Sequence, residues 1–231
     1  MTNSSDAFSP YYKRDFIQSA VDRGTHRAIV GGMWEEVGQL QFDFLVENGL
    51  KPSHRLLDIG CGCLRGGVHF VRYLNPGNYY GIDINRSLLD AVYDIELAQA
   101  GLQERMPRDN LKCGTDFDFS VFAPVFDRAL AVSVFTHLPL NTIRVCLERL
   151  APKMTTGGVF YATFFELPDG IDTWRTYSHE PGGIVTQGNA DRYHYRRRDM
   201  YYVAEDLPFK AAYIGSFKHP RAQHMMAYHR L

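Results

Sequence analysis

The sequence contains few cysteines, and their spacing matches no common metal-binding or redox pattern. The four cysteines are Cys61, Cys63, Cys113 and Cys146, and no two of them form a C-x-x-C pair. A disulfide-held secreted scaffold needs more cysteines, and a structural zinc site needs ligands at defined spacings. The sequence also lacks the H-E-x-x-H motif of zinc enzymes, so we expect no metal. Reduced, buried thiols indicate a cytoplasmic chain.

Long apolar runs and an excess of one charge are also absent. No run approaches the ~18 apolar residues that span a bilayer, and the polar N-terminus lacks the apolar core of a secretory signal. The 25 Lys and Arg residues balance 26 Asp and Glu residues, which gives a net charge of −1. Such a chain has no general attraction for phosphate backbones or anionic membranes. We therefore expect neither a membrane nor a nucleic-acid partner, whereas the oligomeric state stays open.

The composition is that of a globular protein, and the pattern along the chain divides it in two. The 231 residues are 45% hydrophobic and 22% charged, which is typical of soluble domains. Helical spacing of apolar residues predicts one helix over residues 10–22 and another that follows Gly31-Gly32 and ends at Asn48-Gly49. We interpret residues 1–50 as an N-terminal helical cap and residues 51–231 as the main domain.

Strands and helices alternate through the main domain. Strands are predicted at 55–59, 78–84, 110–113, 126–133, 158–166, 209–216 and 223–230, and helices at 66–74, 86–101, 140–154 and 198–205. This alternation predicts an α/β fold with a mostly parallel sheet. Residues 167–197 break the pattern with a loop of about 30 residues, where connections are usually ~2–6 residues long. We expect a lid-like insertion there.

The most informative segment is LLDIGCGCLRGG at residues 56–67. An apolar strand runs into a glycine turn and then a helix, and Gly60 and Gly62 allow the backbone to approach a ligand closely. Asp58 suits a ligand that carries a positive charge, and Asp83, at the next strand end, suits a ribose diol. A nicotinamide dehydrogenase is disfavoured, because Arg65 stands where G-x-G-x-x-G needs its third glycine.

These strand ends resemble those of the Rossmann-like (class I) S-adenosylmethionine-dependent methyltransferases over residues 50–166. The family's acid-x-Gly-x-Gly-x-Gly motif matches Asp58, Gly60 and Gly62, with Leu64 in place of the third glycine, and its second-strand acid matches Asp83. The segment FDRALAVSVFTHL at 126–138 is similar to the family's fourth strand, and Gly157-Gly158 opens the fifth. The resemblance implies a mostly parallel sheet with an antiparallel C-terminal strand.

The resemblance also implies the cofactor, S-adenosyl-L-methionine, and the residues that contact it. The two turn glycines would pass beneath its methionine part, and Asp83 would hold both ribose hydroxyls. Asp116 and Phe117, at the end of the third strand, would meet the adenine. The full implied set is Asp58, Gly60, Cys61, Gly62, Asp83, Ile84, Asp116, Phe117, Ser133 and Phe135.

Three histidines are candidates for catalysis. His137 follows the fourth strand at the carboxyl edge of the sheet, where open α/β sheets bind ligands, and it could take a proton from a hydroxyl acceptor. His179 and His194 lie in the 167–197 loop, where Trp174 and Tyr193 are expected to border the acceptor pocket. A structural role is the alternative for each histidine. The arginines at 192 and 196–198 form either an anion site or a solvated face.

Two motifs that are missing from the sequence narrow the range of possible methyl acceptors. After the fourth strand there is no Asn/Asp-Pro-Pro-Tyr motif of base-amine methyltransferases, and no paired-glutamate loop of arginine methyltransferases is visible. With balanced charge and a self-contained lid, methyl transfer to a small-molecule or sugar-like acceptor is favoured, on oxygen. The alternatives are an N-methyltransferase and a methyltransferase-like domain that binds the cofactor or a partner without catalysis.

Overall fold

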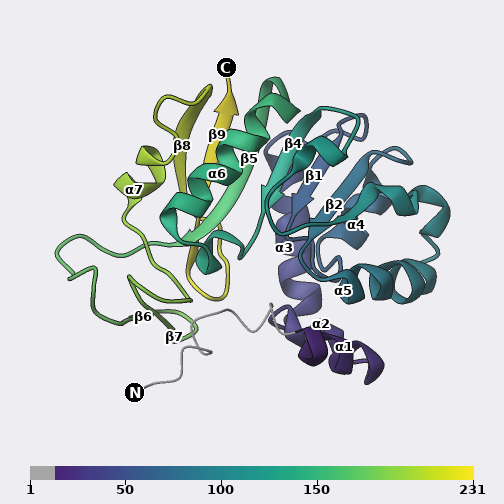
Figure 1. Ribbon diagram of the computed structural model, residues 1–231, viewed down its shortest axis with the longest axis horizontal. Helices are drawn as coiled ribbons and strands as arrows, with labels where there is room; N and C mark the ends of the chain where they lie inside the picture. Colours follow the sequence, from purple (N-terminus) through teal and green to yellow (C-terminus); the bar gives the residue numbers. More distant parts are fainter. Residues whose placement is uncertain (1–13) are drawn as a thin grey trace. The chain divides into compact units, whose positions relative to one another are not determined.

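The computed structural model describes residues 14–231, and these form two compact units that divide after Leu130. Residues 1–13 of the predicted cap, which include Tyr11 and Tyr12, lie outside the described residues. Figure 1 shows the elements of each unit by label and by position along the chain.

The first unit consists of a group of helices followed by four parallel strands (Figure 1). Strand β1 lies between β2 and β4 and is parallel to both, and β2 pairs in parallel with β3. Parallel pairing brings the carboxyl ends of β1, β2 and β3 to one edge. The main elements are α1 (Arg14–Asp22), α2 (His26–Ile29), α3 (Trp34–Glu47), β1 (Leu56–Ile59), α4 (Gly67–Tyr73), β2 (Tyr79–Asp83), α5 (Arg86–Ala91), β3 (Leu111–Cys113) and β4 (Phe126–Ala131).

The second unit contains three long strands with two helices. Strand β9 (Gln223–Arg230) lies between β5 (Met154–Phe165) and β8 (Phe209–Ser216) and is antiparallel to both. Helix α6 (Leu140–Leu150) precedes β5, and α7 (Arg197–Tyr202) lies against β8 (Figure 1). The strand order of the sheet is β3-β2-β1-β4-β5-β9-β8. The predicted α/β fold, mostly parallel with an antiparallel C-terminal strand, is confirmed.

Burial follows the sequence pattern within each unit. Leu56 and Leu57 of β1 are completely buried, as expected for a central parallel strand that is covered on both faces. In the second unit, the rings of Phe160 in β5 and Tyr228 in β9 are also completely buried and stack with centroids 5.8 Å apart. These apolar strands provide the rigid support for the polar residues at their ends.

Three predicted elements differ from the structure. The helix predicted over 86–101 is α-helical from Arg86 to Ala91, continues as a π-helix, η2 (Val92–Leu97), and is α-helical again at residues 98–99. The helix predicted over 140–154 ends at Leu150, and η7 (Ala151–Lys153) joins it to β5, which begins at Met154. The 167–197 loop contains a hairpin of two short strands, β6 (Tyr177–His179) and β7 (Ile184–Thr186). The remaining single-turn helices are η3 (Gln103–Arg105), η4 (Arg108–Asn110), η5 (Phe119–Val121) and η6 (Phe135–His137).

Candidate functional site

The turn after β1 has the backbone conformation that glycine favours. Gly60 has a φ of +70° and Gly62 a φ of +54°, in the left-handed region where a side chain is strained. The N–H groups of Gly60 and Cys61 donate to the carbonyl of Ile82, at 2.8 and 3.2 Å. Leu64 also has a positive φ, 61°, and is completely buried. Leu64, where the resemblance expects a third glycine, thus has a left-handed backbone and packs in the core.

Asp83, at the end of β2, is fixed by two backbone donors. Its Oδ2 accepts from the Gly62 N–H at 2.9 Å, and its Oδ1 accepts from the Asn85 N–H at 2.9 Å. Burial raises the pKa of Asp83, and these backbone hydrogen bonds oppose that rise. Each carboxylate oxygen can accept a further hydrogen bond. The side chain is therefore held in place with capacity left for a diol.

Asp58, in β1, forms a buried hydrogen bond with Tyr79. The Tyr79 hydroxyl donates to its Oδ2 at 2.7 Å. Burial raises the pKa of Asp58 to about 7, although this hydrogen bond opposes the rise. A cation bound nearby would favour the ionised carboxylate. Asp58 is thus placed to respond to the charge of a ligand.

We expect Asp58→Asn to reduce the pH dependence of stability. An acid whose pKa is raised on folding stabilises the fold fully below its ordinary pKa of 3.8, and this contribution is lost as the pH rises through about 7. Asparagine can still accept from Tyr79 but does not ionise. The difference in unfolding free energy between pH 5 and pH 8 should shrink by about 2–3 kcal/mol in urea titrations. The exposed Asp90→Asn serves as the control, and an equal pH dependence in both variants would contradict this account.

The segment after β3 lies close to the end of β2. The Gly114 N–H donates to the Asp83 carbonyl at 3.1 Å, and the Cys113 thiol donates to the Ile84 carbonyl at 3.5 Å. Asp116 is exposed and Phe117 is half-buried, with a φ of +57°. The structure therefore brings Cys61, Ile84 and the start of this segment to the same strand ends as Asp83, with Asp116 and Phe117 accessible at the surface.

A buried charge cluster, which sequence reasoning missed, joins the first helices to the π-helix. The Glu96 side chain is only 2% exposed and accepts from His26 Nε2 at 2.7 Å and from Arg27 Nε and Nη2 at 2.8 and 2.6 Å. Burial opposes ionisation, but the hydrogen bonds from Arg27 and His26 outweigh it and hold the pKa of Glu96 below its ordinary value. The π-helix places Glu96 in this position, and such insertions are frequent at functional sites.

The segment between α2 and α3 lies directly against the glycine turn. Arg65 Nη1 donates to the carbonyls of Val30 and Gly32, at 2.9 and 3.1 Å. A Cβ atom added at Gly62 would lie 2.9 Å from Val30 Cγ1. The Cys63 thiol donates to the His26 carbonyl at 3.8 Å. Helix α2 and the segment after it are thus attached to the residues that directly follow the turn, through the side chains of Cys63 and Arg65.

In the second unit, His137 forms a close pair with a carboxylate. Its Nδ1 lies 2.6 Å from Asp191 Oδ1, and the two side chains are 21% and 13% exposed. His137 ends the helical turn η6 after β4, whereas Asp191 belongs to the 167–197 segment. A carboxylate on Nδ1 fixes the orientation of the ring, as in nucleophile–base–carboxylate triads. Sequence reasoning found His137 but not Asp191.

His179 and His194 lie inside the 167–197 segment instead of at its surface. Both are buried, and the Thr186 hydroxyl lies between them, 2.8 Å from His179 Nε2 and 2.8 Å from His194 Nδ1. The second ring nitrogen of His194 lies 3.0 Å from the Thr173 carbonyl oxygen. Burial lowers the pKa of His179 to about 4, with a smaller contribution from the charge of His194. These contacts favour a role in holding the β6–β7 hairpin.

Ser133 and Phe135 follow β4 in different environments. The Ser133 N–H donates to Thr163 Oγ1 at 2.7 Å, and Gln223 Nε2 donates to Ser133 Oγ at 2.9 Å. Phe135 is 1% exposed and packs against Phe160, with ring centroids 5.8 Å apart. Ser133 is thus part of a polar cluster, whereas the contacts of Phe135 are those of a core residue.

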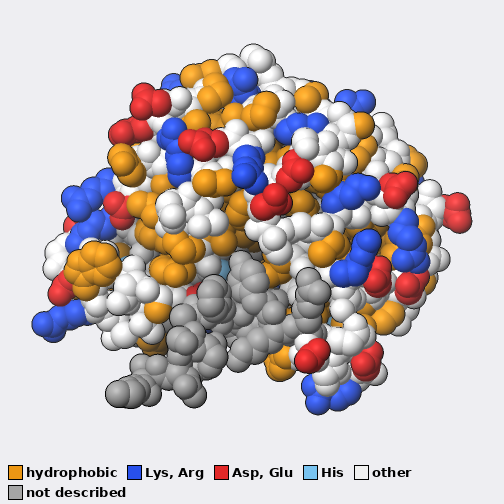
Figure 2. Space-filling view, in the orientation of Figure 1, with side chains coloured by type: hydrophobic (Ala, Val, Ile, Leu, Met, Phe, Trp, Pro, Cys, Tyr) orange, Lys and Arg blue, Asp and Glu red, His pale blue; other side chains and the backbone are white. Residues whose placement is uncertain are grey.

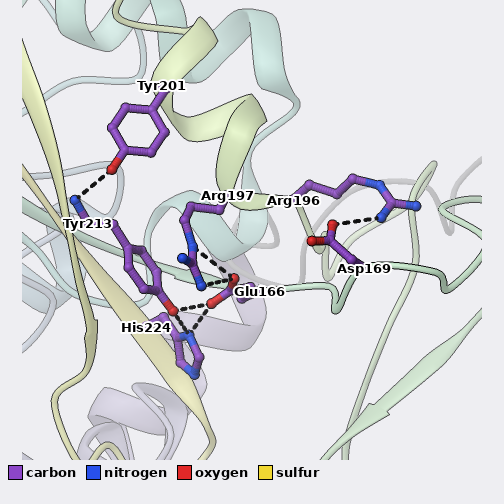
Figure 3. Close-up of polar contacts among 7 residues, drawn as sticks. All are labelled: Glu166, Asp169, Arg196, Arg197, Tyr201, Tyr213 and His224. Carbon is purple, nitrogen blue, oxygen red and sulfur yellow. Dashed lines mark hydrogen bonds and ion pairs between the residues drawn. The ribbon is translucent and has the colours of Figure 1, made fainter.

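A second polar cluster surrounds Glu166, directly after β5 (Figure 3). Arg197 donates to Oε1 through Nε and Nη2, at 3.2 and 3.0 Å, while Tyr213 and His224 both contact Oε2. Burial opposes ionisation of Glu166, but hydrogen bonds from Tyr213, His224 and Arg197 hold its pKa below the ordinary value. Nearby, Arg196 pairs with Asp169 at 3.4 Å. Two of the clustered arginines are therefore engaged within the fold.

Residues 14–231 contain neither a metal-binding cluster nor a membrane-spanning helix. In that part of the chain, no group of three His, Cys, Asp or Glu side chains is arranged to hold a metal ion. None of the helices there is both long enough and apolar enough to cross a membrane. The four cysteines are all free thiols.

Comparison with known proteins establishes the fold. No protein-family model matches the sequence. Magnesium protoporphyrin IX methyltransferase (ChlM) from Synechocystis PCC 6803 with bound SAM aligns over 100% of both chains, with 16% identity and a TM-score of 0.64. The CcbJ methyltransferase from Streptomyces caelestis aligns with 14% identity and a TM-score of 0.65, over 93% of this chain and 96% of that one. The chain has the class I methyltransferase fold.

The class I methyltransferase fold does not by itself identify the reaction. The [4+2]-cyclase SpnF is similar to this chain over 97% of both chains, with 16% identity and a TM-score of 0.63. Identities this low establish a shared architecture only, and function depends on the site that the fold carries. Any activity of this chain therefore depends on the residues of its own site.

Proposed function

We propose that this protein is an S-adenosylmethionine-dependent methyltransferase that acts on oxygen of a small-molecule or sugar-like acceptor. The observation that carries the proposal is the Asp83 carboxylate, held by the N–H groups of Gly62 and Asn85 beside the glycine turn. A fixed carboxylate next to a turn of accessible backbone suits a ligand with a ribose diol and a charged tail. The structural likeness to ChlM with bound SAM supports this cofactor.

The residues at the strand ends of the first unit fit the parts of this cofactor. In the proposal, Gly60, Cys61 and Gly62 lie against its methionine part, and Asp83 accepts from both ribose hydroxyls. Asp116 and Phe117, both accessible, recognise the adenine, and Ile84 lines that side. Asp58 responds to the positive charge through its raised pKa. Ser133 and Phe135 complete the set implied by the resemblance, although the burial of Phe135 favours core packing.

His137 is proposed as the base for a hydroxyl acceptor. The cofactor supplies a methyl group on a sulfonium, a good leaving group, so the protein has to position the acceptor and remove its proton. With Asp191 on Nδ1, the other ring nitrogen of His137 would take that proton, and the carboxylate would stabilise the charged ring. A base of this kind contributes ~10²–10⁴-fold in rate.

The 167–197 segment is proposed to border the acceptor. Trp174 is 72% exposed, and Tyr193 is partly exposed, with its backbone N–H bonded to the Thr136 carbonyl at 2.8 Å. Exposed aromatic rings on a supported segment are suited to contact an acceptor. In this proposal, His179 and His194 keep the segment folded instead of taking protons, because their contacts lie inside it.

The distribution of charged side chains on the surface favours an acceptor other than nucleic acid. On the face shown in Figure 2, Lys and Arg side chains are interspersed with Asp and Glu among the described residues. A nucleic-acid site usually concentrates positive charge on one face. The free thiols are consistent with the reducing cytoplasm that we propose as its location.

A mass-spectrometric screen tests the reaction. The protein, S-adenosylmethionine and pools of candidate hydroxylated metabolites would be incubated, and products heavier by one CH₂ unit would be sought. We expect such a product, with the methyl group traced to labelled cofactor. Cofactor binding without transfer to any acceptor would favour the second candidate, a non-methylating domain, which the likeness to the cyclase SpnF keeps open. A product methylated only on nitrogen would point to an N-methyltransferase.

Residues 1–50 are proposed to act as a cap over the cofactor, since the segment from Val30 to Gly32 lies against the glycine turn. Deleting residues 1–28 should therefore weaken cofactor affinity several-fold, as measured by calorimetry. Because the deletion leaves the Glu96 charge buried without Arg27, it is made in a Glu96→Gln background, and Glu96→Gln alone is the control. Equal affinity of the two proteins would show that these helices only pack.

A further inference from the structure

The 167–197 segment leaves and rejoins the second unit at one ion pair. Glu166 directly precedes the segment and Arg197 ends it, and the guanidinium donates to Oε1 through two nitrogens, at 3.2 and 3.0 Å (Figure 3). The backbone of Glu166 also forms a parallel bridge with Tyr195. We call the ion pair between Glu166 and Arg197 the neck. The neck joins the two ends of a long connection.

The neck is anchored to the sheet through the other carboxylate oxygen. Tyr213 in β8 donates to Oε2 of Glu166, and His224 in β9 contacts the same oxygen (Figure 3). The two donors lie 2.7 Å from each other, and Arg197 stacks 3.7 Å above the Tyr213 ring. The Glu166 side chain is only 14% exposed. Hydrogen bonds to an ionised carboxylate are stronger than those between neutral groups, and here the carboxylate is shielded while the Arg197 side chain is 52% exposed.

A continuous series of contacts leads from the neck to His137. The Tyr195 N–H donates to the Phe165 carbonyl at 2.9 Å, and its hydroxyl donates to the Leu138 carbonyl at 2.5 Å. Two residues earlier, the Tyr193 N–H donates to the carbonyl of Thr136, the neighbour of His137. Two residues earlier again, Asp191 reaches His137 Nδ1 at 2.6 Å. Residues 191, 193 and 195 of the segment are thus each attached to residues 136–138 or to β5.

We propose that Glu166 is a positioning residue that, by holding Arg197 at the neck, keeps Asp191 within hydrogen-bond reach of His137. This inference rests on the proposed function, because it concerns the residue assigned there as the base. Glu166 lies at the far end of the contact series and acts through it. The neighbouring Asp169–Arg196 pair provides the comparison. Its carboxylate is exposed and lies 3.4 Å from Arg196 Nη1, and among the described residues no side chain from a strand donates to it.

Nuclear magnetic resonance tests the proposal on the full chain without cofactor or acceptor. The ¹⁵N shifts of the His137 ring, assigned with a His137→Gln variant, report which nitrogen carries the proton, and amide exchange reports the Tyr193–Thr136 bond. In the unmutated protein we expect the proton on Nδ1, facing Asp191. In the Glu166→Gln protein, the ¹⁵N shifts of the His137 ring should move toward those of Asp191→Asn. The Tyr193 amide should exchange about tenfold faster or more. Asp169→Asn, the matched control, should change neither.

Arg197→Gln is the second variant, since it opens the neck but leaves Tyr213 and His224 on Glu166. It should change the ¹⁵N shifts of the His137 ring in the same way as Glu166→Gln. Glu166→Asp should return these shifts part of the way to their values in the unmutated protein. If the His137 ring and Tyr193 exchange are unchanged in the folded Arg197→Gln protein, the proposal is wrong. A changed ring in a protein that transfers no methyl group would instead contradict the proposed function and leave the positioning role intact.

Discussion

Replacing His137 with alanine should lower turnover of a hydroxyl acceptor by about 10²-fold or more and leave cofactor affinity within a few-fold. The reason is that His137, oriented by Asp191 at 2.6 Å, is the proposed proton acceptor, whereas the cofactor contacts proposed for the first unit do not include it. Steady-state kinetics give the turnover, and calorimetry gives the affinity for S-adenosylmethionine.

Two further variants make this prediction specific. Asp191→Asn should reduce turnover by a smaller factor, because His137 remains but loses its orienting carboxylate. His219→Ala, at a buried histidine of the same unit, controls for general loss of structure. If His137→Ala prevents cofactor binding, His137 belongs to the cofactor site and the base has to be sought elsewhere. If it changes neither quantity, the acceptor is an amine or a carboxylate that needs no base.

Replacing Asp83 with alanine should weaken binding of S-adenosylmethionine by about 5- to 150-fold, which corresponds to ~1–3 kcal/mol for unmade hydrogen bonds to a diol. The same carboxylate accepts from Gly62 and Asn85 at 2.9 Å, so the variant also loosens the turn. Calorimetric titration measures the affinity, and thermal unfolding shows whether the variant is folded.

Asp83→Asn separates the two effects of the alanine variant. Asparagine keeps the size of the side chain, but its amide replaces one acceptor with a donor and cannot serve both backbone groups and the ribose. It should lose most of the affinity with a smaller loss of stability. Asp109→Ala, at an exposed position of the same unit, should bind the cofactor normally. Unchanged affinity in both Asp83 variants would remove this residue from the site.

The glycine turn and Asp83 could be predicted from sequence because both features are local. An apolar strand followed by two glycines encodes the turn, and parallel pairing brings Asp83 to the same edge. Leu64, at the position of the motif's third glycine, has a φ of 61°, in the left-handed region that glycine adopts without strain. The fold class followed from the same alternation of strands and helices.

The remaining contacts depend on long-range packing that leaves no periodic signal. Asp191 and His137 are 54 residues apart, and they meet only because of the path of the 167–197 segment. The strands β6 and β7 have three residues each, too few for an alternating pattern to be recognised. Glu96 reaches Arg27 because a π-helix changes the helical register at Val92, and an α-helical pattern does not reveal this change.

The most direct test of the account is a calorimetric titration of the unmutated protein with S-adenosylmethionine and, separately, with its demethylated product. We expect saturable binding of both ligands at one site, and weaker binding in the Asp83→Ala protein. The absence of binding heat, together with an unchanged melting temperature at millimolar ligand, would contradict the claim that this fold carries a working cofactor site.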